Sequence, residues 1–277
     1  MSEILWCADN GDGTYRNPVL YCDYSDPDAI CVNGTYYLTA STFNYVPGLP
    51  ILTSRDLVNW KLRNYAVKNI PEARYAAPQH AQGIWAPAIR FQNGRFYIYY
   101  GMPDEGIYMV RAADACGQWD APKLVRAGKG LIDPCPFWDD DGRAYVIHAY
   151  ANSRIGFKSR IGIFPMSADG THAIGEDKFL FDGTANHPTI EGPKVYKRDG
   201  WYYIFAPAGG VATGWQTVLR SRRIDGEYED HIVLRQGNSR VNGPHQGAWG
   251  TAADGSDWFI HFQSRGLYGL SLIHISE

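Results

Sequence analysis

The chain of 277 residues carries 26 lysines and arginines against 29 aspartates and glutamates, a formal net charge of −3, and 45% of its residues are hydrophobic. This composition excludes an intrinsically disordered chain, and the lack of any apolar run of about 18 residues excludes a membrane-spanning helix. No cluster of Lys and Arg occurs in the sequence. We therefore expect neither nucleic acid nor a membrane surface as a partner.

The first residues of the chain show no export signal. Residues 1–10 read MSEILWCADN, which has neither a basic stretch nor a long apolar core. The five cysteines are scattered and form no CxxC pair, a pattern typical of reduced thiols. The sequence thus predicts a cytoplasmic protein in which residues 1–16 form an N-terminal extension.

Five short hairpins are predicted along the chain, each built around an Asn-Gly or Asp-Gly pair. Both residues of such a pair accept the positive φ angles that a two-residue type I′ turn requires. The pairs are Asn33-Gly34, Asn93-Gly94, Asp141-Gly142, Asp199-Gly200 and Asp254-Gly255, and successive pairs are 48 to 60 residues apart. The aromatic-rich strands that follow them are 35–41, 95–101, 143–149, 201–207 and 256–262.

The length of the repeat indicates the architecture. A shorter strand precedes each turn, and one or two further apolar strands follow, with no long helical periodicity. A unit of about 50 residues with three to four strands has the size of a propeller blade. The sequence therefore predicts an all-β, five-bladed β-propeller over residues 17–269. The shorter strands are 29–32, 87–91, 135–138, 193–196 and 248–251.

Acidic residues recur at one phase of this repeat. Because the first strand of each blade lies innermost, residues at equal phase should meet at one mouth of the central channel. Asp and Glu also favour the turns before strands for purely structural reasons. Like charges that converge cost stability, however, so agreement in phase favours a functional explanation. Trp85, Asp133, Glu191 and Gln246 each stand eight residues before their turn, with His245 beside the last, and Asp26 stands seven residues before the first turn.

Three carboxylates beside aromatic rings fit one reaction class best. Hydrolysis of a glycosidic bond needs one protonated carboxyl for the leaving oxygen and one ionised carboxylate for water, and flat rings pack on sugar faces. The sequence contains no phosphate-binding loop, zinc-protease motif or nucleophile elbow.

Several segments, taken together and in order, resemble glycoside hydrolase family 43. The resemblance covers residues 17 to about 269 and implies a five-bladed propeller and an inverting mechanism. It also implies β-xylosidase or α-L-arabinofuranosidase activity on hemicellulose. The segments are 24–28, 41–43, 83–87, 132–134 with 139–143, 190–193 and 243–247.

The resemblance implies a role for each axial carboxylate. Asp26 matches the general base, Glu191 the general acid, and Asp133 the residue that orients the acid and tunes its pKa. An ionised Asp133 would favour the protonated form of a neighbouring acid. Inversion needs room for a water, so we expect the carboxyls of Asp26 and Glu191 to lie about 6.5–9.5 Å apart.

The resemblance also implies a set of residues that contact the sugar, namely Phe43, Trp85, His245, Gln246 and Arg265. For the aromatic residues, ordinary packing in the propeller core is the alternative explanation. His245 lies at the axis in the family pattern, where it can contact an ion indirectly or bind a water, and a simple hydrogen bond is the alternative. No cofactor is required, although a structural calcium at the propeller axis is compatible with the pattern.

Other functions stay open at this point. The expected substrate is a pentose-containing oligosaccharide or polysaccharide, but the sequence does not separate xylose from arabinofuranose, exo from endo cleavage, or one oligomeric state from another. An arabinanase is the alternative enzyme. A non-catalytic carbohydrate-binding propeller is the alternative of another class, and it predicts a disrupted acid or base, whereas all three carboxylates are present.

The last eight residues differ in character from the rest. Residues 270–277 read LSLIHISE, which is the translation of a transposase mosaic-end adapter. The sequence thus predicts a non-native tail at 270–277 and a fifth blade that is incomplete, with an exposed strand edge.

Overall fold

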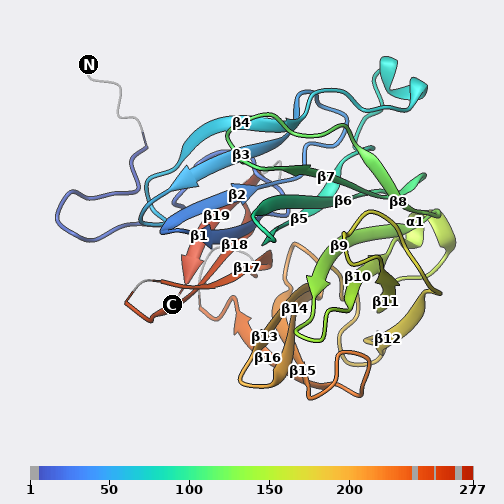
Figure 1. The fold of residues 1–277 in the computed structure, drawn as a ribbon. Coiled ribbons are helices and arrows are strands. Elements are labelled where there is room, and N and C mark those ends of the chain that lie inside the picture. The colour runs from blue at the N-terminus through green and yellow to red at the C-terminus, as the bar shows by residue number, and fades with distance from the viewer. Residues whose placement is uncertain (1–5, 239–242, 253, 266–269, 277) are drawn as a thin grey trace.

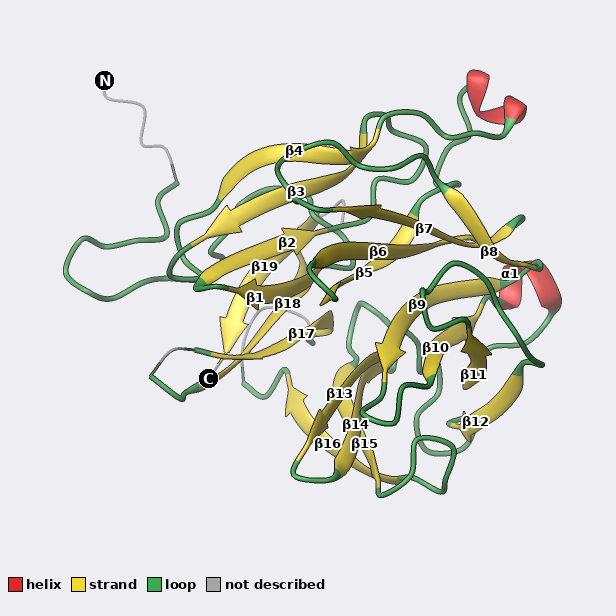
Figure 2. Ribbon diagram, viewed as in Figure 1, coloured by secondary structure: helices red, strands yellow, loops and turns green. Residues whose placement is uncertain are grey.

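The chain folds into five antiparallel sheets arranged around one axis as the blades of a propeller (Figures 1 and 2). The computed structural model describes residues 6–238, 243–252, 254–265 and 270–276. The prediction of an all-β, five-bladed β-propeller is confirmed. Among these residues, no helix is long and apolar enough to cross a membrane.

Each blade follows the order of the chain from the inner strand outward. In four sheets the strand order is sequential over four strands, and the fifth sheet has three strands within the described residues. The first blade comprises β1 (Asp28–Val32), β2 (Thr35–Thr39), β3 (Gly48–Ser54) and β4 (Lys61–Val67), and the second β5 (Trp85–Gln92), β6 (Arg95–Met102), β7 (Gly106–Ala112) and β8 (Lys123–Ala127). The third comprises β9 (Leu131–Trp138), β10 (Ala144–Tyr150), β11 (Arg160–Met166) and β12 (Lys178–Asp182), and the fourth β13 (Lys194–Arg198), β14 (Trp201–Ala208), β15 (Trp215–Ser221) and β16 (Glu229–Arg235). The fifth comprises β17 (His245–Thr251), β18 (Asp257–Arg265) and β19 (Leu270–Ser276); the short helices are η1 (Ala73–Ala76) and α1 (Asn152–Ile155).

Three of the five predicted hairpin turns are tight. In the first blade Val32 pairs with Thr35, and the residues between them have φ angles of 50° and 69°. The second and fourth blades repeat this geometry. Positive φ at both positions is what favours the Asn-Gly and Asp-Gly pairs there.

The predicted two-residue turns at 141–142 and 254–255 are wrong, because each belongs to a longer connection. β9 and β10 pair through Trp138 and Ala144, so the connection is 139–143. Asp139 is buried there and accepts hydrogen bonds from Lys197 Nζ at 2.5 Å and Tyr202 Oη at 2.6 Å, which hold it against the fourth blade. In the fifth blade the connection is 252–256.

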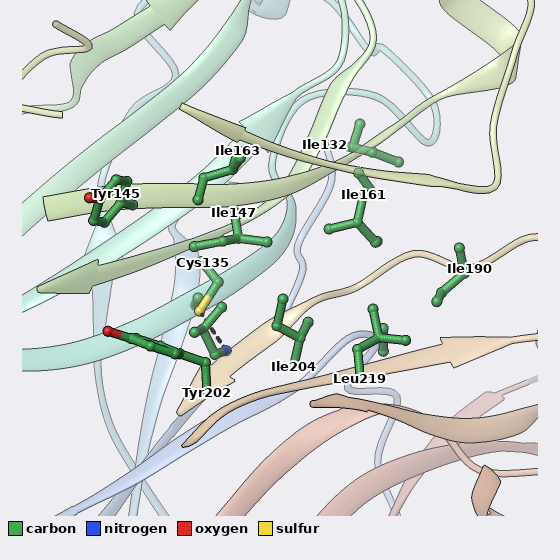
Figure 3. Close-up of a cluster of buried hydrophobic side chains, with 14 of the residues drawn as sticks. Ile132, Cys135, Tyr145, Ile147, Ile161, Ile163, Ile190, Tyr202, Ile204 and Leu219 are labelled. Atoms are coloured by element: carbon green, nitrogen blue, oxygen red, sulfur yellow. Dashed lines mark hydrogen bonds between the residues drawn. The ribbon is translucent and has the colours of Figure 1, made fainter. Parts of the chain in front are cut away.

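Apolar side chains join neighbouring blades. An aliphatic cluster fills the space between the third and fourth blades, as Figure 3 shows. The fourth and fifth blades meet through aromatic rings instead, with the Phe205 ring centroid 5.4 Å from Trp249 and 5.6 Å from Phe259. This packing fixes the inner strands around the axis and hence the residues at their ends. The aliphatic cluster includes Ile132, Ile147, Ile161, Ile163, Ile190, Ile204 and Leu219.

The fifth blade is closed by the N-terminal part of the chain. β19 pairs with β18 along its length, and Leu272, Ile273 and Ile275 are buried. Residues 19–24 run along the other edge of β19, where the Val19 N–H donates to the Ile273 carbonyl at 2.8 Å. That edge is therefore covered, in contrast to the exposed edge that we expected. The adapter origin of residues 270–277 stays a prediction, which sequencing of the source clone tests.

Candidate active site

Three carboxyl groups converge where the inner strands begin. Asp26 lies just before β1, Asp133 is in β9, and Glu191 lies just before β13. Asp26 and Asp133 adopt positive φ angles of 53° and 55°, a backbone conformation that costs energy in residues with a side chain and is often found at functional sites. The charges of Glu191 and Asp26 both act on Asp133. The structure thus brings the three predicted carboxyls to one mouth of the channel.

Asp26 is half-buried and held by two hydroxyls. Its Oδ2 accepts hydrogen bonds from Ser41 Oγ at 2.6 Å and Ser25 Oγ at 3.0 Å. Ser41 Oγ in turn accepts the Ala86 N–H at 2.7 Å, which ties this side chain to the second blade. Burial raises the pKa of Asp26, and the hydroxyl of Ser41 opposes the rise. Within the described residues both hydroxyls use Oδ2, which leaves Oδ1 for another partner.

The carboxyl of Asp133 is buried and feels the charge of Glu191. Asp133 is only 3% exposed, and its Oδ2 accepts the Gly192 N–H at 2.8 Å. Burial raises the pKa of Asp133 well above its ordinary value, and the carboxyls of Glu191 and Asp26 raise it further. An ionised neighbour makes a carboxyl harder to ionise, so the charge of Glu191 favours the neutral form of Asp133.

His245 and Gln246, the first residues of β17, face the same space. His245 Nε2 lies 3.0 Å from Glu191 Oε1. His245 Nδ1 and Gln246 Oε1 are buried, and neither has a hydrogen-bond partner within the described part of the chain. Such atoms are normally satisfied, so they indicate where a water or a ligand would bind.

The predicted calcium at the axis has few direct ligands available. Calcium takes six to eight oxygen ligands. The described residues contain no group of three or more His, Cys, Asp or Glu side chains placed to hold a metal ion. An ion beside His245 would therefore be held mainly by water, and its presence stays a prediction.

The two predicted aromatic residues lie at the same mouth. Phe43 exchanges backbone hydrogen bonds of 2.9 and 3.0 Å with Ile84, so it is anchored beside the start of β5. Trp85 is half-buried, its Nε1–H donates to the Ala81 carbonyl at 3.2 Å, and the Arg154 guanidinium lies 5.4 Å from its ring centroid. The predicted side chain of Arg265 lies outside the described part of the chain.

Two basic side chains near these residues were not predicted from the sequence. Lys194, the first residue of β13, is fully buried, and its Nζ donates to the Pro87 carbonyl at 3.1 Å. Arg154 of α1 is held by Asp104, whose oxygens lie 3.2 and 3.3 Å from Nε and Nη2. The position of Lys194, three residues after Glu191, is the only sequence signal that marks it.

A second charged layer lies two residues further along the inner strands. Asp28 is fully buried, and its Oδ2 accepts hydrogen bonds from Arg90 Nη1 at 2.7 Å and the Ile89 N–H at 2.8 Å. Arg90 Nη2 lies 2.9 Å from Cys135 Sγ. Burial opposes the charge on Arg90, but Asp28 raises its pKa. Beyond this pair a cavity of about 500 Å³ opens at the other end of the channel, lined by residues that include Gln92.

Comparison with known proteins agrees with this geometry. The sequence model of the family described as Glycosyl hydrolases family 43 matches residues 15–272. A putative beta-xylosidase of Xylanibacter ruminicola is 46% identical over 269 residues, which are 97% of this chain and 49% of that protein. A non-reducing end alpha-L-arabinofuranosidase of Bacteroides ovatus is 32% identical over 238 residues, covering 83% of this chain and 43% of that protein.

A solved structure shows the same fold. The xylan beta-1,4-xylosidase from Bacillus halodurans superposes with a TM-score of 0.83 at 27% identity, over 94% of this chain and 53% of that one. The chain thus spans about half the length of these named relatives.

Proposed function

Because the chain belongs to glycosyl hydrolase family 43, we propose that it is an inverting glycosidase that releases terminal xylose or arabinofuranose from hemicellulose-derived chains. The named β-xylosidase and α-L-arabinofuranosidase relatives support these two sugars. The observation that carries the proposal is the meeting of three carboxyls from three blades at one mouth of the channel. Their excess of negative charge opposes stability and suits acid–base chemistry.

The mechanism assigns one step to Glu191 and one step to Asp26. Glu191 donates its proton to the glycosidic oxygen as the bond to the anomeric carbon breaks. A water attacks that carbon from the opposite face and gives a proton to Asp26. The products are a sugar of inverted configuration and a free hydroxyl on the remaining chain, after which proton exchange with water resets both carboxyls.

The surroundings of Asp26 suit the role of base. Its burial raises its affinity for a proton, and the hydroxyls of Ser25 and Ser41 hold Oδ2 so that Oδ1 can face the water. The acid step requires a proton on Glu191, and an ionised Asp133 beside it would favour that form. The separation of about 6.5–9.5 Å between the carboxyls of Asp26 and Glu191 stays a prediction.

The test is the release of sugar from 4-nitrophenyl β-D-xyloside and 4-nitrophenyl α-L-arabinofuranoside. Proton NMR of the first product should show the α-anomer of xylose or the β-anomer of arabinofuranose, before mutarotation mixes the anomers. The Glu191→Ala variant, assayed on xylobiose, controls for contaminating activity. Formation of the retained anomer would contradict the mechanism. Binding of xylo-oligosaccharides without release would favour the non-catalytic propeller instead.

A further inference from the structure

A buried lysine lies two residues after Gly192, whose N–H contacts Asp133, and it has no part in the mechanism above. Lys194 is 0% exposed, and its Nζ donates a hydrogen bond of 3.1 Å to the Pro87 carbonyl. An ammonium group loses several kcal/mol of hydration when it is buried, so its charge must be compensated nearby. Its charge acts on the carboxyl of Asp133 and opposes protonation there.

The placement of Lys194 follows from one short segment. Residues 191–194 begin with the predicted acid, continue with the Gly192 N–H that donates to Asp133 at 2.8 Å, and end with Lys194. The same segment therefore carries the acid and two groups that stabilise negative charge on its neighbour. Glu191 itself points to a different partner, His245, at 3.0 Å.

We propose that Lys194 is a positioning residue that stabilises the ionised form of Asp133 and thereby supports Glu191 as the acid. This inference rests on the proposed function and deepens it. Of the two carboxyls, Asp133 is the more buried, and burial favours its neutral form. A cation and an N–H donor that act on Asp133 oppose this effect and favour its ionised form, which the acid step needs.

Other charged groups face the pair and must stay unchanged in the test. Asp26 and His245 lie at the same mouth, and their charges act on the carboxyls from the first and fifth blades. The Asp28–Arg90 pair lies in the next layer of the channel and is internally balanced. None of these groups is altered by a substitution at Lys194, so a change in the pH profile reports on the ammonium itself.

Two variants remove the charge in different ways. Lys194→Met replaces the side chain with an apolar one of similar length, and Lys194→Gln keeps a donor for the Pro87 carbonyl. For both we expect kcat/KM on xylobiose to fall about 10- to 100-fold, within the range that general acid catalysis contributes. The loss on 4-nitrophenyl β-xyloside should be smaller, because 4-nitrophenolate leaves with little help from an acid.

The pH profile separates this role from a structural one. Removal of a positive charge makes every nearby carboxyl hold its proton more tightly, so both limbs of the kcat/KM profile should move to higher pH while the maximum falls. A variant that merely loosens the fold would lower the profile without moving its limbs. The proposal would be overturned if the limbs of the kcat/KM profile stayed at the wild-type pH values and the losses on the two substrates were equal. One folded variant is enough for this test.

A control and a double variant complete the experiment. Lys123 of β8 is exposed, so Lys123→Met makes the same chemical change away from the channel and should behave as wild type. In an Asp133→Asn background, Lys194→Met should cost less than about threefold, because its target carboxylate is gone. An active wild type with unaffected Lys194 variants contradicts this inference alone, whereas a wild type that releases no sugar contradicts the proposed function and this inference with it.

Discussion

The central channel contains two layers of charged residues, and they differ in whether the buried charges are balanced. Asp26 and Asp133 belong to the outer layer, whereas Asp28 and Cys135 lie two residues further along the same strands. In the inner layer the Asp28 carboxylate meets the Arg90 guanidinium at 2.7 Å, so the buried charges cancel. Among the described side chains of the outer layer the carboxyls outnumber the cations, and burial raises the pKa of Asp133.

The two layers should contribute differently to the stability of the fold and to catalysis. A balanced buried pair is strongly destabilising to break, since one charge is then left alone. Burial raises the pKa of Asp26 and of Asp133, so the fold loses stability as pH rises through the folded pKa values of these two carboxyls. The inner layer should therefore respond to substitution mainly in the free energy of unfolding, and the outer layer mainly in turnover.

The largest effect is expected for Asp26→Ala. Loss of the base removes activation of the water, so kcat should fall about 10³- to 10⁴-fold on both 4-nitrophenyl substrates. Steady-state release of 4-nitrophenol measures this, and the midpoint of thermal unfolding should stay at or above that of the wild type. An Asp26→Ala variant with activity near that of the wild type would contradict the assignment of Asp26 as the base.

Glu191→Ala should separate substrates by their leaving groups. On xylobiose we expect a loss of about 10³-fold, and on 4-nitrophenyl β-xyloside a loss nearer tenfold, because only the former needs a protonated leaving oxygen. Parallel kcat/KM measurements on the two substrates check this. Equal losses on both would show that Glu191 is not the acid.

Arg90→Met tests the inner layer. It leaves Asp28 buried without its cation, which should lower the free energy of unfolding by about 3–5 kcal/mol. Urea unfolding followed by tryptophan fluorescence measures the loss. The folded variant should keep kcat within a few-fold of wild type, and Asp28→Asn added to it should recover part of the stability. An unchanged unfolding midpoint would show that the pair contributes nothing.

Asp133→Asn should stabilise the fold in a pH-dependent way. The pKa of Asp133 is raised in the folded state, so the native protein binds this proton more tightly than the unfolded chain does. Stability is therefore lost as pH rises above the ordinary value of 3.8 towards the folded pKa. The variant removes this loss, so its thermal midpoint should exceed that of wild type at pH 8, by about 2–4 °C per kcal/mol, and match it near pH 4. An equal shift at both pH values would contradict the electrostatic cause.

The smallest effect is expected at the rim of the outer layer. Arg154→Gln removes the guanidinium that lies 5.4 Å from the Trp85 ring. This cation–π contact of about 0.5–1 kcal/mol helps to fix the ring, so its loss should raise KM by at most about two- to fivefold at nearly constant kcat. Steady-state kinetics on xylobiose check this. A fall in kcat alone would mean that Arg154 does not act through substrate binding.

The repeat made much of the fold predictable, because its signals are local. Positive φ angles at Asn33-Gly34 need only the two residues themselves, and equal phase along the inner strands predicted that Asp26, Asp133 and Glu191 would meet. Contacts between blades carry no such signal. Asp139 leaves the expected turn because Lys197 and Tyr202, about 60 residues away, bind it.

The orientation of Lys194 could not be predicted from the sequence for the same reason. Nothing in the local pattern of β13 tells whether its first side chain turns toward solvent or into the channel. That direction depends on the Pro87 carbonyl of the second blade and on the carboxyl of the third. The roles of the site residues themselves stay predictions until the variants are measured.

The closure of the ring has a consequence for how the protein folds. Asn17 exchanges two hydrogen bonds of 2.9 Å with Ile275, although 258 residues separate them. Contacts between such distant residues are formed late, because the chain must first lose the entropy of closing so large a loop. A circular permutant that joins these ends and opens the chain within 168–174, between β11 and β12, would make the closing contact local. Such a chain should refold faster while keeping the same five blades.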